Sequence, residues 1–298
     1  MILPIIDAHM HLWDLTHHRY PWLQEARREM WIGDHSSLRR DYLIQDYLQD
    51  AQRQNVVKCV HLQAQWDHSD PVGETAWLQS VADEHKFPHG IVGFCELGAE
   101  DAQEVIEGHL RYRGIRGIRQ DINWHPDPVY CFCARTDYMR DRTWRRNISL
   151  LKRYELSFDL QIYAGHQGED AYHLIKDFEG IQFILDHSGA PADRSAEAMA
   201  RWRASIRRLA ELPNIVTKLS GFDMFDQRWT TASLREPIMQ VIETFGPARC
   251  LFASNFPVSG LYGTYDRLVN TFRDILSALS RDEQRMILHD NAARVYRV

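Results

Sequence analysis

The sequence predicts an α/β fold, a closed (β/α)8 TIM barrel, and three features of the chain point to it. Short β-rich runs recur at intervals of about 25 to 45 residues, each followed by a longer, charged segment with helical periodicity. We count eight such runs, which suits a closed barrel of parallel strands better than an open sheet. With 298 residues, of which 44% are apolar, the chain can form one barrel domain over residues 1–298.

The strands are expected where apolar and β-branched residues follow one another in short runs. These runs are residues 5–11, 56–63, 90–97, 115–122, 156–163, 181–187, 215–220 and 250–255. The segments between them repeat apolar residues at helical spacing. Helices are therefore expected over residues 43–54, 73–86, 99–112, 143–154, 169–179, 196–212, 234–245 and 265–279, with a last one over 281–291.

The two longest connections after strands are residues 13–37 and 123–141, and both are rich in aromatic, His and Arg side chains. In a (β/α)8 barrel the loops that follow the strands build the active site. We expect these two loops to cover the active face, and polar residues at strand ends to carry the chemistry.

Composition excludes several classes of function. The chain has 35 Lys and Arg against 41 Asp and Glu, a formal net charge of −6, with no basic cluster for nucleic acid. Apolar runs are far shorter than the roughly 20 residues of a membrane span, and the N-terminus lacks a secretory signal, so we expect a cytoplasmic protein. A Rossmann fold is the alternative, but no Gly-x-Gly-x-x-Gly follows the first strand.

Three of the five cysteines, Cys59, Cys95 and Cys250, lie within apolar runs and are expected to pack as reduced hydrophobic residues. Cys131 and Cys133 have one residue between them, which is too close for a zinc knuckle.

The first strand ends in a pair of histidines that share one face. Because side chains alternate along a strand, Asp7, His9 and His11 point one way, and Ala8 and Met10 the other. Two imidazoles placed like this at a barrel mouth can chelate a divalent metal or polarise a carbonyl.

Two further strand ends add polar groups to the same face. Strand six is expected to deliver His187 to the mouth, whereas Asp186 has the opposite parity. Strand eight is followed by Asn255, which brings an amide to the mouth of the barrel.

These residues belong to six motifs, which occur along most of the chain. They are Asp7-x-His9-x-His11, Gly114-Ile115-Arg116-Gly117-Ile118-Arg119, Asp186-His187-Ser188-Gly189, Lys218-Leu219-Ser220-Gly221, Ser254-Asn255-Phe256-Pro257-Val258 and Asn291-Ala292-Ala293-Arg294-Val295-Tyr296. The set resembles the amidohydrolase superfamily, specifically its amidohydrolase 2 branch of TIM-barrel lactonases such as sugar-acid and pyrone-dicarboxylate lactonases.

The resemblance implies roles for several residues. His9, His11 and His187 would surround the reacting carbonyl, with His187 as the first candidate for the base that activates water. Water on a metal held by His9 and His11 is the second. Arg119, in preference to Arg116, would hold a substrate carboxylate or hydroxyl with its planar guanidinium.

Two positions depart from the metal-dependent members of this family. A histidine usual after strand five is replaced by Gln161, and an aspartate usual after strand eight is replaced by Asn255. An amide is a poor zinc ligand and cannot take a proton from water at neutral pH, so Asn255 could only position the water. We expect no obligatory cofactor, with zinc or manganese bound weakly, if at all, by His9, His11 and His187.

Further side chains at strand ends are candidate substrate contacts: Trp66, Trp124, Gln161, Lys218 and Ser220. The function predicted first is a hydrolase that opens a lactone of a sugar acid or a related carboxylated substrate. A metal-dependent decarboxylase or amide hydrolase is the alternative, and a non-catalytic binding barrel is the second alternative. The partner is thus a small molecule, and exposed barrel helices also allow a homodimer.

Overall fold

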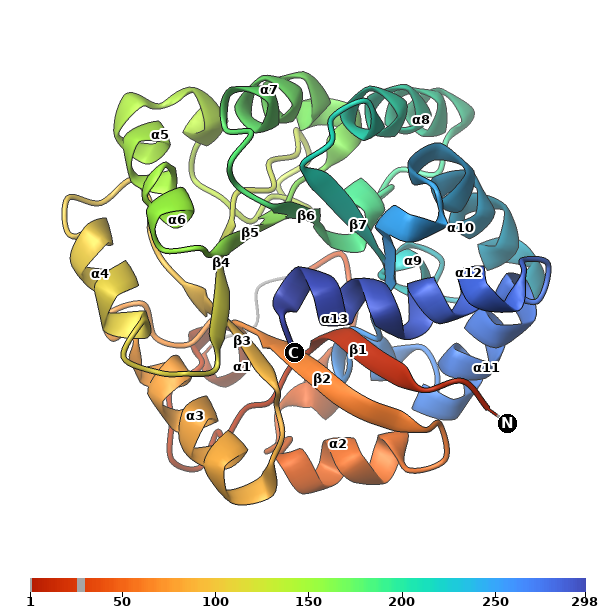
Figure 1. The fold of residues 1–298 in the computed structure, drawn as a ribbon, viewed down its shortest axis with the longest axis horizontal. Helices are drawn as coiled ribbons and strands as arrows, with labels where there is room; N and C mark the ends of the chain where they lie inside the picture. Colours follow the sequence, from red (N-terminus) through yellow and green to blue (C-terminus); the bar gives the residue numbers. More distant parts are fainter. Residues whose placement is uncertain (1, 26–29) are drawn as a thin grey trace.

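The computed structural model describes residues 2–25 and 30–298. Eight parallel strands form one sheet in the order β1-β2-β3-β4-β5-β6-β7-β8, and helices surround them (Figure 1). The strands are β1 (Ile5–Met10), β2 (Val56–Leu62), β3 (Gly90–Phe94), β4 (Ile115–Asp121), β5 (Ser157–Gln161), β6 (Phe183–Leu185), β7 (Ile215–Leu219) and β8 (Cys250–Phe252). The predicted (β/α)8 barrel is confirmed.

The barrel closes beside the histidines of the first strand. The backbone N–H of Asn255 donates to the His9 carbonyl oxygen at 2.7 Å, and the backbone N–H of His11 donates to the Phe256 carbonyl oxygen at 2.7 Å. Met10 and Phe256 form a parallel bridge at the same place. The segments that carry the candidate site residues of β1 and β8 are therefore held together by the closure itself.

The helices follow the strands in the expected order. They are α1 (Pro21–Gln24), α2 (Ile44–Ala51), α3 (Gly73–His85), α4 (Ala102–His109), α5 (Arg142–Ile148), α6 (Leu150–Arg153), α7 (Ala164–Asp177), α8 (Ala196–Ala210), α9 (Phe222–Phe225), α10 (Thr231–Phe245), α11 (Tyr265–Leu276), α12 (Arg281–Arg285) and α13 (Asn291–Tyr296). The helix predicted over 143–154 is divided into α5 and α6 at Ser149.

Several expected boundaries differ from those of the structure, among them those of two helices and one strand. Helix α7 begins at Ala164 rather than at 169, because the buried Gln167 side chain bonds to the loop after β4 and holds an extra turn in place. The last helix does not end at 291 but continues through a π turn, Met286–Asp290, into α13. The sixth strand stops at Leu185, so that His187 lies in a turn instead of on the strand.

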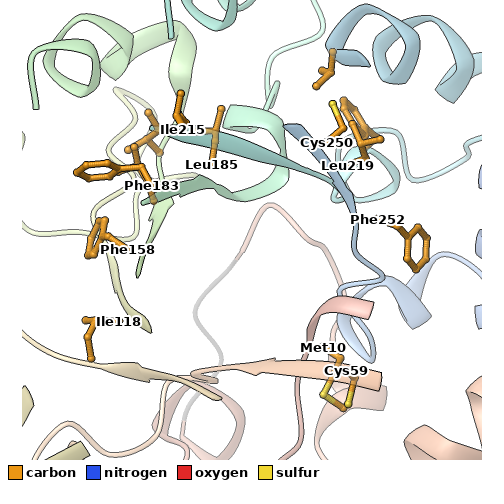
Figure 2. Packing of buried hydrophobic residues seen from close by; sticks show 14 of the residues in the cluster. Met10, Cys59, Ile118, Phe158, Phe183, Leu185, Ile215, Leu219, Cys250 and Phe252 are labelled. Atoms are coloured by element: carbon orange, nitrogen blue, oxygen red, sulfur yellow. The ribbon is translucent and has the colours of Figure 1, made fainter. Parts of the chain in front are cut away.

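Apolar side chains pack on both sides of the strands. Inside the barrel, residues such as Ile6, Val60 and Val216 meet Val295 and Tyr296 of α13. The larger layer lies between the strands and the outer helices, where Figure 2 shows Phe158, Phe183 and other labelled side chains around the ring of strands.

Helices α12 and α13 cross one end of the barrel, with the C-terminus near its centre (Figure 1). This is the end where the strands begin, since Val298 lies against Gly90, the first residue of β3. The opposite end, where the strands finish, remains for the functional site.

Two predictions from composition can be compared with the structure. Cys59, Cys95 and Cys250 are buried, as expected, and burial raises the pKa of each thiol. Among residues 2–25 and 30–298, no helix combines the length and the apolar character that a membrane crossing requires.

Candidate active site

A cavity of about 190 Å³ lies at the end of the barrel where the strands finish. Its walls include Trp13, Trp22 and Trp31 of the first long loop and Phe132 of the second, so both loops cover this face as predicted. Residues 26–29 of the first loop lie outside the described part of the chain. The polar side chains that line the cavity are His11, Gln65, Arg119, Asp121, Asn123, Gln161, His187 and Asn255.

The three histidines singled out in the sequence do come together. His9 Nε2 lies 3.1 Å from His11 Nε2, and the rings of His9 and His187 are centred 4.8 Å apart. His11 and His187 line the cavity, whereas His9 is fully buried behind them.

Hydrogen bonds define which nitrogen atoms of His11 and His187 face the cavity. His11 Nδ1 lies 2.8 Å from the Leu62 carbonyl oxygen, which can only accept, so the imidazole carries its proton on Nδ1 and a lone pair on Nε2. His187 Nδ1 lies 2.9 Å from Ser220 Oγ, which leaves Nε2 for a substrate or water. Ser220 is therefore a support for His187 and does not line the cavity.

Burial keeps these imidazoles neutral at pH 7. It lowers the pKa of His9 and His11 well below the usual range, and lowers the pKa of His187 to about 4. A neutral imidazole has a lone pair for a proton, so the protonation state suits a base.

Behind His9 lies a fully buried charged network. Lys218 Nζ donates to Asp159 Oδ1 at 2.6 Å and lies 2.9 Å from Asp186 Oδ1. The same ammonium is 3.3 Å from His9 Nδ1, and Tyr296 donates its hydroxyl to Asp159 at 2.5 Å. Lys218 is thus placed within the barrel and not in the cavity lining, where a substrate contact would be.

The pKa values of the two carboxyl groups in this network are shifted in opposite directions. Burial raises the pKa of Asp159 to about 6, while Lys218 and His9, acting against burial, hold the pKa of Asp186 well below its usual range. One ammonium therefore faces two carboxylates, and His9 is oriented by both Lys218 and Asp186, whose Oδ1 is 3.5 Å from His9 Nδ1.

Arg119 lines the cavity, whereas Arg116 does not, but the Arg119 guanidinium already has protein partners. Nη1 donates to Gln161 Oε1 at 2.9 Å, and Nη2 donates to the Gln63 carbonyl at 2.5 Å. Nη1 also lies 3.5 Å from Asp186 Oδ2. Both terminal nitrogens that would bind a substrate carboxylate thus have acceptors within the protein. Gln161 accepts a hydrogen bond from Arg119 and also lines the cavity.

Asn255 adds an amide next to His11. Its Oδ1 lies 3.3 Å from His11 Nε2, and its Nδ2 lies 3.1 Å from Met224 Sδ. If His9 carries its proton on Nδ1 and directs it toward Asp186, then His9 Nε2, His11 Nε2 and Asn255 Oδ1 each present a lone pair to the others. Such a set can hold a cation, though weakly, because an amide oxygen is a poor zinc ligand.

A metal site made by His9, His11 and His187 has less support than one made by His9, His11 and Asn255. Among the residues described, no group of three or more His, Cys, Asp or Glu side chains is arranged to hold a metal ion. The donors that converge are two imidazole nitrogens and one amide oxygen, with His187 held toward Ser220 instead.

Two predicted contacts lie away from the cavity. The Trp66 ring packs against His18 and Tyr20, with ring centres 4.5 and 5.4 Å away. Trp124 donates its backbone amide to Gln167, and neither tryptophan is part of the cavity wall.

Asp121 is a cavity residue that the sequence reasoning missed. It is the last residue of β4, and its Oδ2 accepts a hydrogen bond from Gln65 Nε2. Burial raises its pKa. The available signal was its parity, since Asp121 and Arg119 point to the same face of one strand.

Comparison with known proteins places the chain in a family. Residues 6–298 match the family model described as Amidohydrolase (amidohydrolase 2). The uncharacterized protein y4mH of Sinorhizobium fredii is 41% identical, with 99% of both chains covered. An L-fucono-1,5-lactonase of Burkholderia multivorans is 29% identical over 98% of this chain and 95% of the relative. A crystal structure of a B. multivorans amidohydrolase with bound Zn has a TM-score of 0.81 at 28% identity, and covers 99% of both chains. The chain belongs to the amidohydrolase 2 family.

Proposed function

We propose that the protein is a lactonase that opens the lactone ring of a sugar acid by attack of water on the carbonyl. The observation that carries the proposal is the group of His9, His11 and His187, neutral at pH 7, with His11 and His187 lining one cavity and His9 buried directly behind them. The L-fucono-1,5-lactonase among its relatives supports this class of substrate.

In this proposal His187 is the base. Its Nε2 takes a proton from water as the water oxygen attacks the lactone carbonyl, and Ser220 keeps the ring oriented through Nδ1. When the tetrahedral intermediate collapses, the bond to the ring oxygen breaks, and His187 returns the proton to that oxygen. The product is a free hydroxy acid.

The carbonyl needs a partner for its developing negative charge. When Lys218 donates to His9 Nδ1, His9 carries its proton on Nε2 and donates it to His11 Nε2, 3.1 Å away. The candidate donor to the carbonyl is then the side-chain amide of Asn255, which lines the cavity. The Asn255 amide, which also faces His11, can present its NH2 group instead of its oxygen.

A divalent ion is the other source of polarisation. His9 Nε2, His11 Nε2 and Asn255 Oδ1 would hold it, and zinc or manganese bound there would act as a Lewis acid. Because two imidazoles and an amide form a weak set of donors, we propose that the ion is not obligatory.

The experiment is proton release from a panel of aldonolactones and pyrone lactones, measured on one preparation before and after chelation. We expect turnover that survives chelation. Loss on chelation, with recovery in zinc or manganese, would instead show that the ion is required.

The first prediction concerns His187→Ala. Removal of the base should lower kcat/KM for the best lactone by about 100-fold or more. His173→Ala is the matched control, because His173 is exposed on α7 and pairs with Glu169. Turnover within a few-fold of wild type in His187→Ala would contradict this mechanism.

Other outcomes would favour the other functions. Release of CO2 from aromatic acids, dependent on a metal, would make the protein a decarboxylase. A lactone that raises the melting temperature and is never hydrolysed would make it a binding protein.

A further inference from the structure

Two buried polar atoms at the cavity lack a hydrogen-bond partner within the described part of the chain. They are Arg119 Nε, a donor, and Asp121 Oδ1, an acceptor. They belong to side chains that are 6% and 10% exposed, and they lie 3.7 Å apart. That distance is too long for a direct hydrogen bond.

The other polar atoms of both side chains are occupied. Arg119 uses its terminal nitrogens on Gln161 and Gln63, and Asp121 uses Oδ2 on Gln65. Arg119 Nε and Asp121 Oδ1 therefore form an ion pair in the cavity wall in which neither atom has a hydrogen bond. Leaving a buried donor and a buried acceptor without hydrogen bonds is costly, so the pair is suited to an added group that bridges it.

One hydroxyl group satisfies both atoms. Its oxygen accepts from Arg119 Nε–H and its proton goes to Asp121 Oδ1, at about 2.9 Å from each, a distance that the 3.7 Å gap permits. A substrate carboxylate has no proton to donate, and it would meet the charge of Asp121.

The charge of the cavity agrees with this polarity. Among the lining residues that the structure describes, Arg119 and Asp121 are the only Arg, Lys, Asp or Glu side chains. Arg119 faces the carboxylates of both Asp121 and Asp186, so the described lining residues offer no uncompensated positive charge to an anionic substrate group.

We propose that Arg119 Nε and Asp121 Oδ1 together bind one ring hydroxyl of the substrate, and that Asp121 thereby selects neutral, polyhydroxylated lactones over lactones that carry a carboxylate. This inference rests on the proposed lactonase function. It makes Asp121 a specificity-determining residue, separate from the histidines that act on the carbonyl.

The test compares kcat/KM for neutral aldonolactones, their monodeoxy analogues and lactones with a free carboxylate. In wild type, neutral lactones should be preferred, and one deoxy position should lower kcat/KM by about 10- to 100-fold, as expected for a lost bond to a charged group. For the parent lactone, kcat/KM of the Asp121→Asn variant should be lower than that of wild type by a similar factor. For the deoxy analogue, which lacks the hydroxyl, the variant and wild type should have the same kcat/KM. Its activity on carboxylated lactones should be unchanged or higher.

Asp282→Asn is the matched control, since it removes one carboxylate from the exposed start of α12, far along the chain from the site. If Asp121→Asn does not fold, the deoxy and carboxylate series on wild type still decides the question. Equal loss on every lactone in Asp121→Asn, or a wild-type preference for carboxylated lactones, would overturn the inference.

Failure of the proposed function has a different signature. In that case wild type hydrolyses no lactone. The hydroxyl site is then tested by calorimetry, which compares the affinities of the protein for the same neutral and carboxylated lactones. Tighter binding of the neutral compounds, lost in Asp121→Asn, would support the site without the reaction. Equal binding of both classes would overturn it.

Discussion

At the scale of single residues, His187 reaches the cavity through an unusual backbone. His187 and Ser188 both have positive φ, of 50° and 52°, which L-residues seldom adopt. Gly221 allows this turn to pack closely, because a Cβ there would lie 2.8 Å from His187 Cγ. The position of the proposed base thus depends on a glycine in a neighbouring loop.

Gly221→Ala should therefore lower kcat/KM, an effect that backbone strain alone would not produce. Its φ of +74° disfavours alanine, and the added methyl group would displace the His187 ring. We expect kcat/KM for the best lactone to fall by at least 10-fold. Gly246→Ala is the control, with φ +77° and nothing within 4 Å of its Cβ, and should destabilise the protein without changing kcat/KM. Equal activity in both variants would contradict the argument.

Burial of His187 also predicts the acid limb of the pH profile. Because its pKa is lowered to about 4, the imidazole stays neutral and able to accept a proton above that pH. We expect kcat/KM to stay nearly constant from pH 7 to about 5, and to fall only as the pH approaches about 4. Initial rates in buffers of constant ionic strength measure this. A midpoint near 6.5, the value for an exposed histidine, would show that burial does not control the base.

At the scale of elements, one hydroxyl of α13 reaches the buried charged network behind His9. The Tyr296 hydroxyl donates a hydrogen bond to Asp159 of β5, and Asp159 also accepts one from Lys218 of β7. The C-terminal helix therefore completes the network that orients His9.

Removal of that hydroxyl should cost stability. Tyr296→Phe leaves a buried carboxylate with one partner fewer, so we expect the free energy of unfolding to fall by about 1–3 kcal/mol. Tyr154→Phe is the matched control, because Tyr154 donates to Glu107 on the surface and should change stability by about 0.5 kcal/mol or less. Urea denaturation compares the two variants, and equal effects would contradict a special role for the buried bond.

Helix α3 supplies a buried carboxyl outside this network. Glu74 accepts from the Ala64 amide at 2.9 Å, and burial raises its pKa to about 8. The folded protein therefore holds a proton that the unfolded chain releases near pH 4.3, so this group's contribution to stability falls as the pH rises from about 4.3 to about 8.

Glu74→Gln should remove that dependence, since the amide oxygen still accepts from Ala64 and no charge is buried. We expect the variant to gain melting temperature relative to wild type as the pH rises from 5 to 8. Parallel melting curves for the two proteins over that range would show that Glu74 does not titrate as described.

At the scale of the whole molecule, closure of the barrel joins the two ends of the chain at the site. β1 meets the segment after β8 through His9 and His11, and α13 covers the other end of the strands. Side chains from the end of the first strand and from the segment after the last strand thus meet, at His11 and Asn255. A homodimer remains a prediction, which light scattering in solution would test.

The sequence by itself determined the architecture and the histidines. Alternating short apolar runs and helical segments predict a parallel barrel, because each strand and helix is a local pattern. The parity of β1 likewise predicted that His9 and His11 share a face, and the six motifs indicated the family that the comparisons show.

Only the tertiary structure decided which polar groups meet. Whether Lys218 faces a substrate or Asp159, whether Arg119 has free nitrogens, and whether Asp121 reaches the cavity all depend on register between strands far apart in the sequence. The spacing of residues along one strand predicts the face on which a side chain lies, but not the residue that it contacts. The turn that presents His187 was missed for a related reason, since its positive φ values are maintained by packing against Gly221 and not by local preference.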